Sequence, residues 1–327
     1  MSPALAVPLF CVSLAVTLGA ARLFAGRLDR IGVRFGFPEA LIGLLTALAA
    51  DGPEISSALI ALFKGAHDVG VGVLVGSNGF NLAAMIGLSA LITGRVRLAR
   101  ATLLLEGAVG LIVTLVAATL LLGWLSPASA TVLTVFTLIP YLAVVIAGSR
   151  LSGRHFKRLA QALHEHAATD REPDTSANPT HHLLALIVVD VALIVAGSFG
   201  MVEAALSLGT HWHISDAVLG VLILGPLTSI PNAMTAVRLG VAGRGAALVG
   251  ETFNSNTINL GFGVIVPSLF VTFTAVTTLG KLQLAWLVGA TLVTLAALAR
   301  PGGMRRSQAA VLVVLYFAFV VGTLVGS

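Results

Sequence analysis

The sequence contains few charged residues. Only 10% of its 327 residues are charged, whereas 57% are hydrophobic, and the mean hydropathy is +0.99. A soluble domain carries about 25% charged residues. This composition excludes an ordinary soluble globular protein and predicts an all-α polytopic membrane protein whose solvent is the lipid bilayer.

Other absences narrow the class of protein further. The single cysteine, Cys11, excludes an intramolecular disulfide framework. No glycine-rich phosphate loop followed by Lys-Ser or Lys-Thr is present, which argues against an ATP-driven pump. The N-terminus lacks a basic region before its apolar stretch, so we expect residues 5–23 to be a retained first helix and not a cleaved signal peptide.

Apolar stretches long enough to cross a bilayer recur along the whole chain. About 20 apolar residues are needed for one crossing helix. Ten such spans lie between polar breaks, which places both termini on the same side of the membrane. They cover residues 5–24, 38–62, 70–92, 101–123, 131–148, 182–201, 216–240, 246–270, 282–299 and 308–326.

The basic residues predict the orientation of the spans. Seventeen of the 19 lysines and arginines lie in alternate loops, and only Lys64 and Lys281 lie in the opposite loops. Cytoplasmic loops carry the excess of basic residues, so both termini are expected outside. The short loops and compact chain are typical of a protein of the bacterial inner membrane.

One long polar segment divides the chain into two halves. Residues 149–181 are predicted to form a cytoplasmic linker between a first five-helix half, residues 1–148, and a second, residues 182–327. Because each half has an odd number of spans, the second half enters the membrane from the opposite side. The two halves are therefore predicted to be inverted repeats, an architecture typical of transporters.

Two polar motifs interrupt the apolar pattern, and the second repeats the first 178 positions later. Pro53 precedes Ser77 by 24 residues, and Pro231 precedes Ser255 by the same separation. We interpret them as two halves of one cation site. The first motif covers residues 43–81 and the second covers residues 220–259.

Prolines in the two motifs predict broken helices in the second and seventh spans. Proline lacks a backbone N–H and clashes with the preceding turn. Gly52-Pro53 should therefore free carbonyl groups around residues 48–50, and Gly225-Pro226 with Pro231 should free those near Gly225 and Leu227. Within lipid these carbonyls must be satisfied, and lining an ion site is one solution. The hydroxyls of Thr228 and Ser229 lie beside them; the alternative is a kink that serves packing only.

Two carboxylates are the groups of the first motif that cost the most free energy to place within a bilayer. Asp51 and Glu54 are spaced i, i+3, which places them on roughly one helix face. Charges at this depth require a partner or a wet cavity, and two carboxylates repel each other unless a cation or a proton joins them. Because no His or Cys lies within the polar clusters of the motifs, residues 50–54, 76–81, 228–232 and 254–259, the oxygens favour Na⁺, Ca²⁺, Mg²⁺ or Mn²⁺ over Zn²⁺ or Cu²⁺. The alternative is a structural pair bonded to backbone or hydroxyl groups.

Neutral oxygens accompany these carboxylates in both motifs. Ser77 and Asn81 are spaced i, i+4 on the third span, and Ser255 and Asn259 repeat this spacing on the eighth. Glu251 lies one turn before Ser255, either as a third carboxylate of the site, at its mouth, or as an interfacial acid that snorkels to water.

Two further acids lie in apolar spans outside the motifs. Asp190, in the sixth span, is expected either to pair with a polar group of a neighbouring helix or to belong to a proton path. Glu106 lies near a helix end, where we expect it to snorkel toward water.

The first motif resembles the first α-repeat of the cation/Ca²⁺ exchanger superfamily, through Pro53-Glu54 and Gly76-Ser77-Asn78-x-Phe80-Asn81, and the second motif resembles the second α-repeat. The resemblance implies ten helices as inverted repeats around one Ca²⁺ or several Na⁺. It implies as ligands Glu54, Ser77, Asn81, Thr228, Ser229, Ser255 and Asn259.

The chain departs from that superfamily at two positions. Members usually carry an acidic residue after the proline of the second repeat, where this chain has Asn232, which we keep among the candidate ligands. They usually carry a polar pair such as Thr-Ser before the first proline, where this chain has Ala50-Asp51. One carboxylate has in effect moved from the second repeat to the first.

The sequence therefore predicts a secondary antiporter and not an enzyme. We expect it to exchange Ca²⁺, or a similar divalent cation, for Na⁺ or H⁺ by alternating access. Its partners would be inorganic cations and the bilayer, with no nucleic acid and no cofactor. The alternative is a non-exchanging cation channel or an ion-binding membrane regulator.

Overall fold

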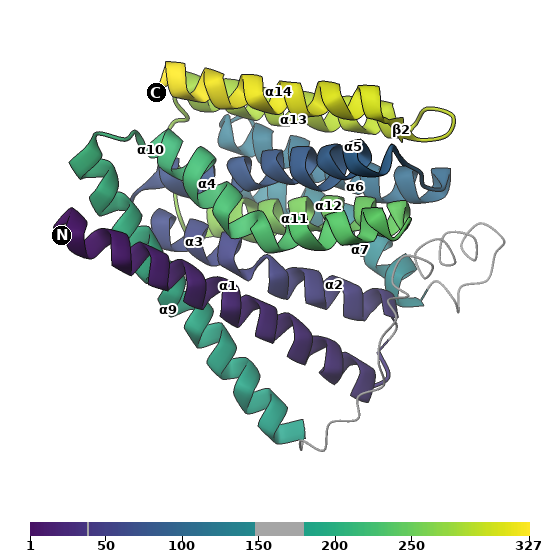
Figure 1. The fold of residues 1–327 in the computed structure, drawn as a ribbon, viewed down its shortest axis with the longest axis horizontal. Coiled ribbons are helices and arrows are strands. Elements are labelled where there is room, and N and C mark those ends of the chain that lie inside the picture. Colours follow the sequence, from purple (N-terminus) through teal and green to yellow (C-terminus); the bar gives the residue numbers. More distant parts are fainter. Residues whose placement is uncertain (38, 148–179) are drawn as a thin grey trace.

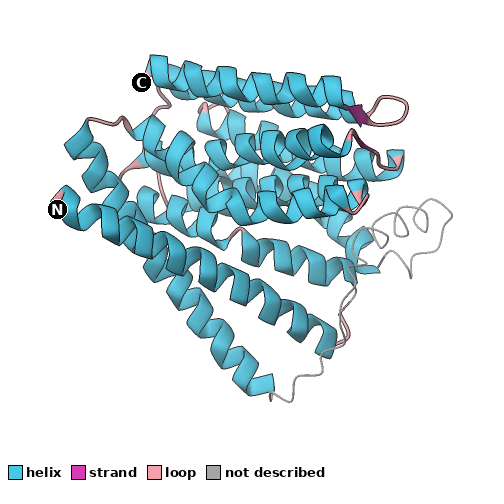
Figure 2. Ribbon diagram, in the orientation of Figure 1, coloured by secondary structure: helices cyan, strands magenta, loops and turns pink. Residues whose placement is uncertain are grey.

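The computed structural model describes residues 1–37, 39–147 and 180–327, and almost all of them are helical (Figure 2). In the first half the helices are α1 (Pro3–Arg34), α2 (Glu39–Ala50), α3 (Gly52–Phe63), α4 (His67–Phe80), the π-helical segment η1 (Asn81–Leu88), α5 (Ser89–Thr93), α6 (Arg100–Leu121) and α7 (Pro127–Ala147). The predicted linker, residues 149–181, lies outside the described residues except for its last two positions.

The described part of the second half is also mainly helical. Its helices are α9 (Thr180–Trp212), α10 (Asp216–Val218), the π-helical segments η2 (Leu219–Leu224) and η3 (Gly261–Ile265), α11 (Gly225–Val241), α12 (Gly245–Leu260), the short 3₁₀ segment η4 (Pro267–Leu269), α13 (Thr278–Leu298) and α14 (Arg306–Gly326).

The described residues form eight helices that are long and apolar enough to cross a membrane, or nine when the bent pair α2–α3 counts as one span. This confirms that the chain is an integral membrane protein. The remaining predicted span, residues 246–270, coincides with α12, η3 and η4, which are helical but do not form one long apolar helix. A total of ten crossings remains a prediction.

The two proline-containing spans differ in structure. The second is broken as predicted: α2 ends at Ala50, α3 begins at Gly52, and their axes bend by 49°. The predicted break in the seventh is wrong, because residues 216–241 form one continuous span. There the wide turns of η2 lead directly into Gly225-Pro226, and Pro226 occupies the first turn of α11, where no backbone donor is required. Pro231 lies inside α11.

The helices α4 and α12 occupy the centre of the molecule (Figure 1). Most residues of both helices are buried. In Figure 1 the pair α13 and α14 runs along one edge and the pair α1 and α9 along the opposite edge, while both chain termini lie at the same end. An even number of crossings produces that placement of the termini.

A short two-stranded ladder joins the halves at the other end of the molecule. Strand β1 (Arg95–Val96) pairs antiparallel with β2 (Met304–Arg305). Both strands belong to loops that the basic residues assign to the cytoplasm, so these loops share one face of the protein, at the end of Figure 1 away from the termini.

The backbones of α4 and the seventh span are in close contact. A Cβ atom built on Gly76 would lie 2.2 Å from the carbonyl oxygen of Val221, and one built on Gly225 would lie 2.7 Å from the backbone nitrogen of Ser77. Small residues permit such approach between helices in a membrane. These glycines therefore set the distance between the two motifs.

Gly76→Ala is expected to destabilise the protein by about 1–3 kcal/mol, because the added methyl group meets rigid backbone atoms. The unfolding transition of the purified protein in detergent measures this effect. Gly289→Ala is the matched control, because a Cβ there meets nothing within 4 Å. Equal transitions for the two variants would contradict the close approach.

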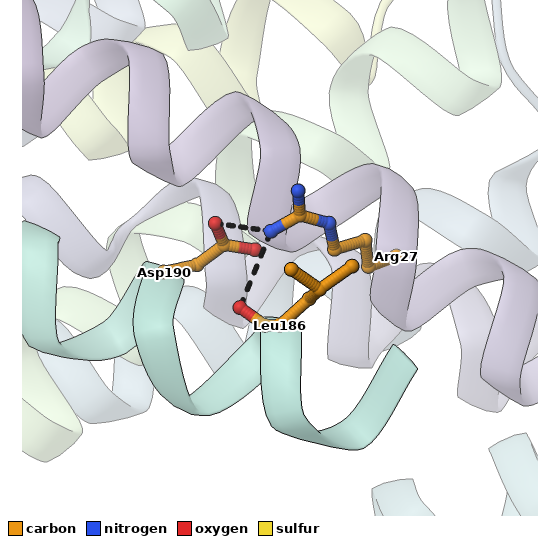
Figure 3. Close-up of polar contacts among 3 residues, drawn as sticks. All are labelled: Arg27, Leu186 and Asp190. Carbon is orange, nitrogen blue, oxygen red and sulfur yellow. Dashed lines mark hydrogen bonds and ion pairs between the residues drawn. The ribbon is translucent and has the colours of Figure 1, made fainter. Parts of the chain in front are cut away.

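An ion pair joins α1 to α9. The guanidinium of Arg27 pairs with Asp190 and also donates to the carbonyl oxygen of Leu186 at 3.2 Å (Figure 3). Asp190 is only 1% exposed. Of the two expectations for Asp190, the structure bears out pairing with a neighbouring helix.

Asp190→Ala is expected to lower the stability by about 3–5 kcal/mol, because it leaves the Arg27 charge without its partner in a poorly hydrated site. The double replacement Arg27→Met with Asp190→Leu is expected to be less destabilising, because no charge remains to be paired. The partly exposed pair Lys64–Glu203 is the contrast: Glu203→Ala should cost no more than about 1 kcal/mol. Detergent unfolding of the four proteins tests the ranking.

Candidate cation site

The two carboxylates of the first motif lie at the break in the second span. Asp51 occupies the joint between α2 and α3, Glu54 lies in the first turn of α3, and both side chains are 0% exposed. The N-terminus of a helix has unpaired N–H groups and a positive dipole end, which favours negative charge there. The Gly52-Pro53 break thus both creates and stabilises the position of these acids.

Donors from the second motif contact both carboxylates. Asn232 Nδ2 donates to Asp51 Oδ1 at 2.7 Å and to Glu54 Oε1 at 3.3 Å. Ser255 Oγ donates to Asp51 Oδ1 at 2.7 Å, and Ser229 Oγ donates to Glu54 Oε1 at 3.0 Å. The structure therefore brings together residues from three helices of the two motifs, α3, α11 and α12. All of these donors are neutral.

Four side-chain oxygens of this cluster are buried without a donor among the described residues: Asp51 Oδ2, Glu54 Oε2, Asn81 Oδ1 and Asn259 Oδ1. In the same described part of the chain, neither carboxylate forms an ion pair with a lysine, arginine or histidine. A buried acceptor with no donor is costly, and a buried charge without a counter-charge is more so. Carboxylate and amide oxygens of this kind are the ligands that hard cations prefer.

The hydroxyl groups of Ser77 and Thr228 are turned so that their oxygens remain available as acceptors. Ser77 Oγ donates to the carbonyl oxygen of Val73 at 2.7 Å, and Thr228 Oγ1 donates to that of Leu224 at 2.8 Å. Thr228 also lies 3.0 Å from the carbonyl oxygen of Gly225, which we had expected to be free. Both side chains are 0% exposed.

Glu251 lies beside this cluster without a hydrogen bond to it among the described residues. It is half-buried on α12. Glu251 lies one turn before Ser255, so it is next to the cluster along α12.

Sequence reasoning missed three polar residues at the cluster. Ser57 is 0% exposed, lies one turn after Glu54, and its hydroxyl has no partner among the described residues. Asn78 and Asn256 are also buried, and they form hydrogen bonds between α4 and α12. The signal for the two asparagines was present, because they are identical residues 178 positions apart, the same separation as the motifs.

The expectation that Glu106 snorkels to water is wrong. Glu106 is 3% exposed, and its Oε2 lies 3.3 Å from the hydroxyl of Tyr141, which in turn donates to Asn254 Oδ1 at 2.8 Å. The helices α7 and α12 supply these neighbours and cover the acid. The position of Glu106 near a helix end did not indicate that α7 and α12 would pack over its side chain.

Proteins of similar sequence include a putative antiporter and an inner membrane protein. The chain is 26% identical over 260 residues to the putative antiporter CaxA of Alkalimonas amylolytica, covering 78% of this chain and 79% of that protein. It is 26% identical over 242 residues to the inner membrane protein YrbG of Escherichia coli K12, covering 72% and 70% of the two chains.

Solved structures of similar fold include those of the sodium-calcium exchanger NCX_Mj. One, soaked with 10 mM Na⁺ and no Ca²⁺, superposes with a TM-score of 0.63 at 22% identity and covers 98% of this chain and 99% of that one. Another, soaked with 2.5 mM Na⁺ and 10 mM Sr²⁺, gives a TM-score of 0.61 at 21% identity, over 98% and 99% of the two chains. The overall folds therefore match.

The sequence profile of one family extends over nearly all of the chain. The family is described as sodium/calcium exchanger protein, and its profile matches residues 5–149 and 182–325. Members of this family are transporters and not enzymes, and they use no cofactor. The polytopic helical fold agrees with the same assignment. This chain belongs to the sodium/calcium exchanger family.

Proposed function

We propose that the protein is a secondary-active antiporter that exchanges Ca²⁺, or a similar divalent cation, for Na⁺ or H⁺ by alternating access. The observation that carries the proposal is the pair Asp51 and Glu54, each fully buried, held by neutral donors through one oxygen, with the other oxygen left without a donor among the described residues. A cation between these oxygens supplies the missing charge.

The ligands we propose are the oxygen-bearing side chains of the two motifs. Their carboxylate, amide and hydroxyl oxygens form a set suited to a hard cation. Because one set of carboxylates binds either the divalent ion or its counter-ions, binding of one displaces the other, and exchange follows. The residues are Asp51, Glu54, Ser77, Asn81, Thr228, Ser229, Asn232, Ser255 and Asn259, with Glu251 at the margin.

The proposal includes ten crossing helices arranged as inverted repeats, residues 1–148 and 182–327, joined by a cytoplasmic linker at 149–181. Two observations support it. The family profile matches one stretch in each half. The hydrogen bond from Asn78 Nδ2 to the carbonyl oxygen of Asn256 has a reciprocal bond from Asn256 Nδ2 to the carbonyl oxygen of Asn78, as a two-fold relation between the halves requires.

We place the protein in a bacterial inner membrane with both termini outside. The excess of basic residues in alternate loops supports this orientation. The pairing of β1 with β2 also supports it, because it joins two of these basic loops at one face.

The proposal is tested with the purified full-length protein in liposomes, by following ⁴⁵Ca²⁺ uptake against imposed Na⁺ or pH gradients. Uptake that depends on an outward Na⁺ or H⁺ gradient is expected. Unlabelled Ca²⁺ on the opposite side should accelerate uptake, because an exchanger couples the two directions. Uptake that requires neither a gradient nor a trans ion identifies the alternative, a channel, and absence of Ca²⁺ binding overturns the site.

A further inference from the structure

We infer that Asn78 and Asn256 are positioning residues, which turn the amide groups of Asn81 and Asn259 so that their oxygens face the cation site. The inference rests on the proposed function, because it assigns a role to residues that do not themselves contact the ion. Its basis is a closed set of amide hydrogen bonds between α12 and the third span, which consists of α4 and, from Asn81, η1.

Asn78 and Asn256 first fasten the two helices to each other. Asn78 Nδ2 donates to the backbone carbonyl of Asn256 at 3.1 Å, and Asn256 Nδ2 donates to the backbone carbonyl of Asn78 at 3.2 Å. The two side chains are 0% and 4% exposed. Their amide nitrogens therefore hold the polar centres of α4 and α12 in register.

The side-chain oxygens of the same two residues hold the candidate ligands. Asn81 Nδ2 donates to Asn256 Oδ1 at 3.1 Å, and Asn259 Nδ2 donates to Asn78 Oδ1 at 3.2 Å. Both ends of each positioning amide thus have partners in the α4–α12 contact. Asn78 and Asn256 are therefore placed to orient ligands and not to bind a cation.

Orientation matters because the two ends of an asparagine amide have nearly the same size and opposite character. The oxygen accepts a cation, whereas the NH₂ group is a donor and repels one. Packing alone does not distinguish the two orientations. A hydrogen bond that captures the nitrogen leaves the oxygen on the other side, and Asn81 Oδ1 and Asn259 Oδ1 are the buried oxygens without a donor among the described groups.

The two ligands differ in how firmly they are held. Asn81 Nδ2 has a second acceptor, Ser255 Oγ, at 3.1 Å, in addition to Asn256. Asn259 Nδ2 bonds to Asn78 in the described structure. We therefore expect loss of the Asn78 side chain to affect its ligand more than loss of the Asn256 side chain.

The test is a set of double-mutant cycles on the full-length protein in detergent, with Ca²⁺ alone as the ligand and its Kd as the readout. Asn256→Ala and Asn78→Ala are each expected to weaken Ca²⁺ binding, by about 10- to 100-fold, the range typical for residues that orient metal ligands. Combined with Asn81→Ala, Asn256→Ala should cause no further loss, because the ligand that it orients is gone.

The crossed combination is the matched control. Asn256→Ala with Asn259→Ala should lose affinity by the product of the single losses, because Asn256 acts on Asn81. The same logic pairs Asn78→Ala with Asn259→Ala as non-additive and with Asn81→Ala as additive. A merely structural role would give the same coupling in all four combinations, and that result overturns the inference.

Two further measurements keep the outcomes distinguishable. If Asn81→Ala and Asn259→Ala leave the Kd for Ca²⁺ unchanged in folded protein, the proposed site itself is wrong. If they weaken binding but the Asn78 and Asn256 variants do not, only the positioning role is wrong. Asn256→Leu, which fills a similar volume without an acceptor, replaces Asn256→Ala should the latter fail to fold, and its expected effect on the Kd is the same.

Discussion

Glu54→Gln is expected to abolish Ca²⁺ exchange, with a loss of at least about 100-fold in the affinity for Ca²⁺. The Oε1 atom of Glu54 accepts from Ser229 at 3.0 Å and from Asn232 at 3.3 Å, while Oε2 has no donor in the described structure. In the variant the amide oxygen takes the place beside these donors. The NH₂ group then points to where the cation binds, so the substitution removes a charge and also presents a donor.

The magnitude follows from the burial of the site. Removing one member of a buried, hydrogen-bonded charge pair costs about 2–5 kcal/mol, and each 1.4 kcal/mol is tenfold in affinity. The measurement is Ca²⁺ binding to the purified protein together with gradient-driven ⁴⁵Ca²⁺ uptake in liposomes.

Glu106→Gln is the matched control, because it makes the same chemical change at another buried acid. Glu106 is 3% exposed, and its recorded partner is the hydroxyl of Tyr141, outside the cluster around Asp51. We expect its exchange to stay within about twofold of the unmodified protein, since uncoupled sites leave each other's free energies nearly unchanged. Normal Ca²⁺ uptake by Glu54→Gln in correctly folded protein would contradict the site.

The break in the second span could be predicted from the sequence, and the form of the seventh could not. At Gly52-Pro53 one helix ends at Ala50 and the next begins at Gly52, which places Pro53 in a first helical turn, where no backbone donor is required. Before Gly225-Pro226 the wider turns of η2 change the hydrogen-bond register, and the span continues. Whether a π-helical segment precedes a proline depends on tertiary packing against α4, which is not visible in a single helix.

Residue types and spacing predicted the candidate ligands, but they did not predict the orientation of the side chains. Because the motif repeats after 178 residues, we assigned the carboxylates and the asparagines to one cation site. It did not indicate that Asn232 would donate to Asp51 and Glu54, because an amide offers a donor and an acceptor and the sequence does not distinguish them. Similarly, Arg27 was assigned to a loop by its charge, whereas α1 extends to Arg34 and places it opposite Asp190.

The position of Asn232 leads to the second large expected effect. It concerns moving one carboxylate from position 51 to position 232. Its Nδ2 atom lies 2.7 Å from Asp51 Oδ1, so positions 51 and 232 face each other across the cluster. A carboxylate moved from one to the other therefore stays within the same group of ligands. The arrangement also explains how two carboxylates occur together in the first motif, because Asn232 donates to both of them.

Asp51→Ser alone is expected to weaken Ca²⁺ binding about 100-fold, because one of the two central carboxylates is lost. Asn232→Glu alone is also expected to impair exchange. It replaces a donor by a third carboxylate within hydrogen-bond distance of Asp51, and like charges at such separation repel. Combining Asp51→Ser with Asn232→Glu should restore Ca²⁺ binding to within about tenfold of the unmodified protein, a coupling of up to about 3 kcal/mol.

Asp51→Ser with Asn232→Gln is the control for this rescue, because glutamine supplies the length of the glutamate without its charge. Ca²⁺ affinity and Na⁺-driven uptake, measured on all five proteins, separate the two effects. If the glutamine and glutamate variants restore binding equally, volume and not charge determines affinity at position 232. If only glutamate restores it, the number of carboxylates in the cluster sets the affinity. Any difference in the preference for Na⁺ or H⁺ between the glutamate double variant and the unmodified protein then comes from the placement of both carboxylates on one half of the chain in the unmodified protein.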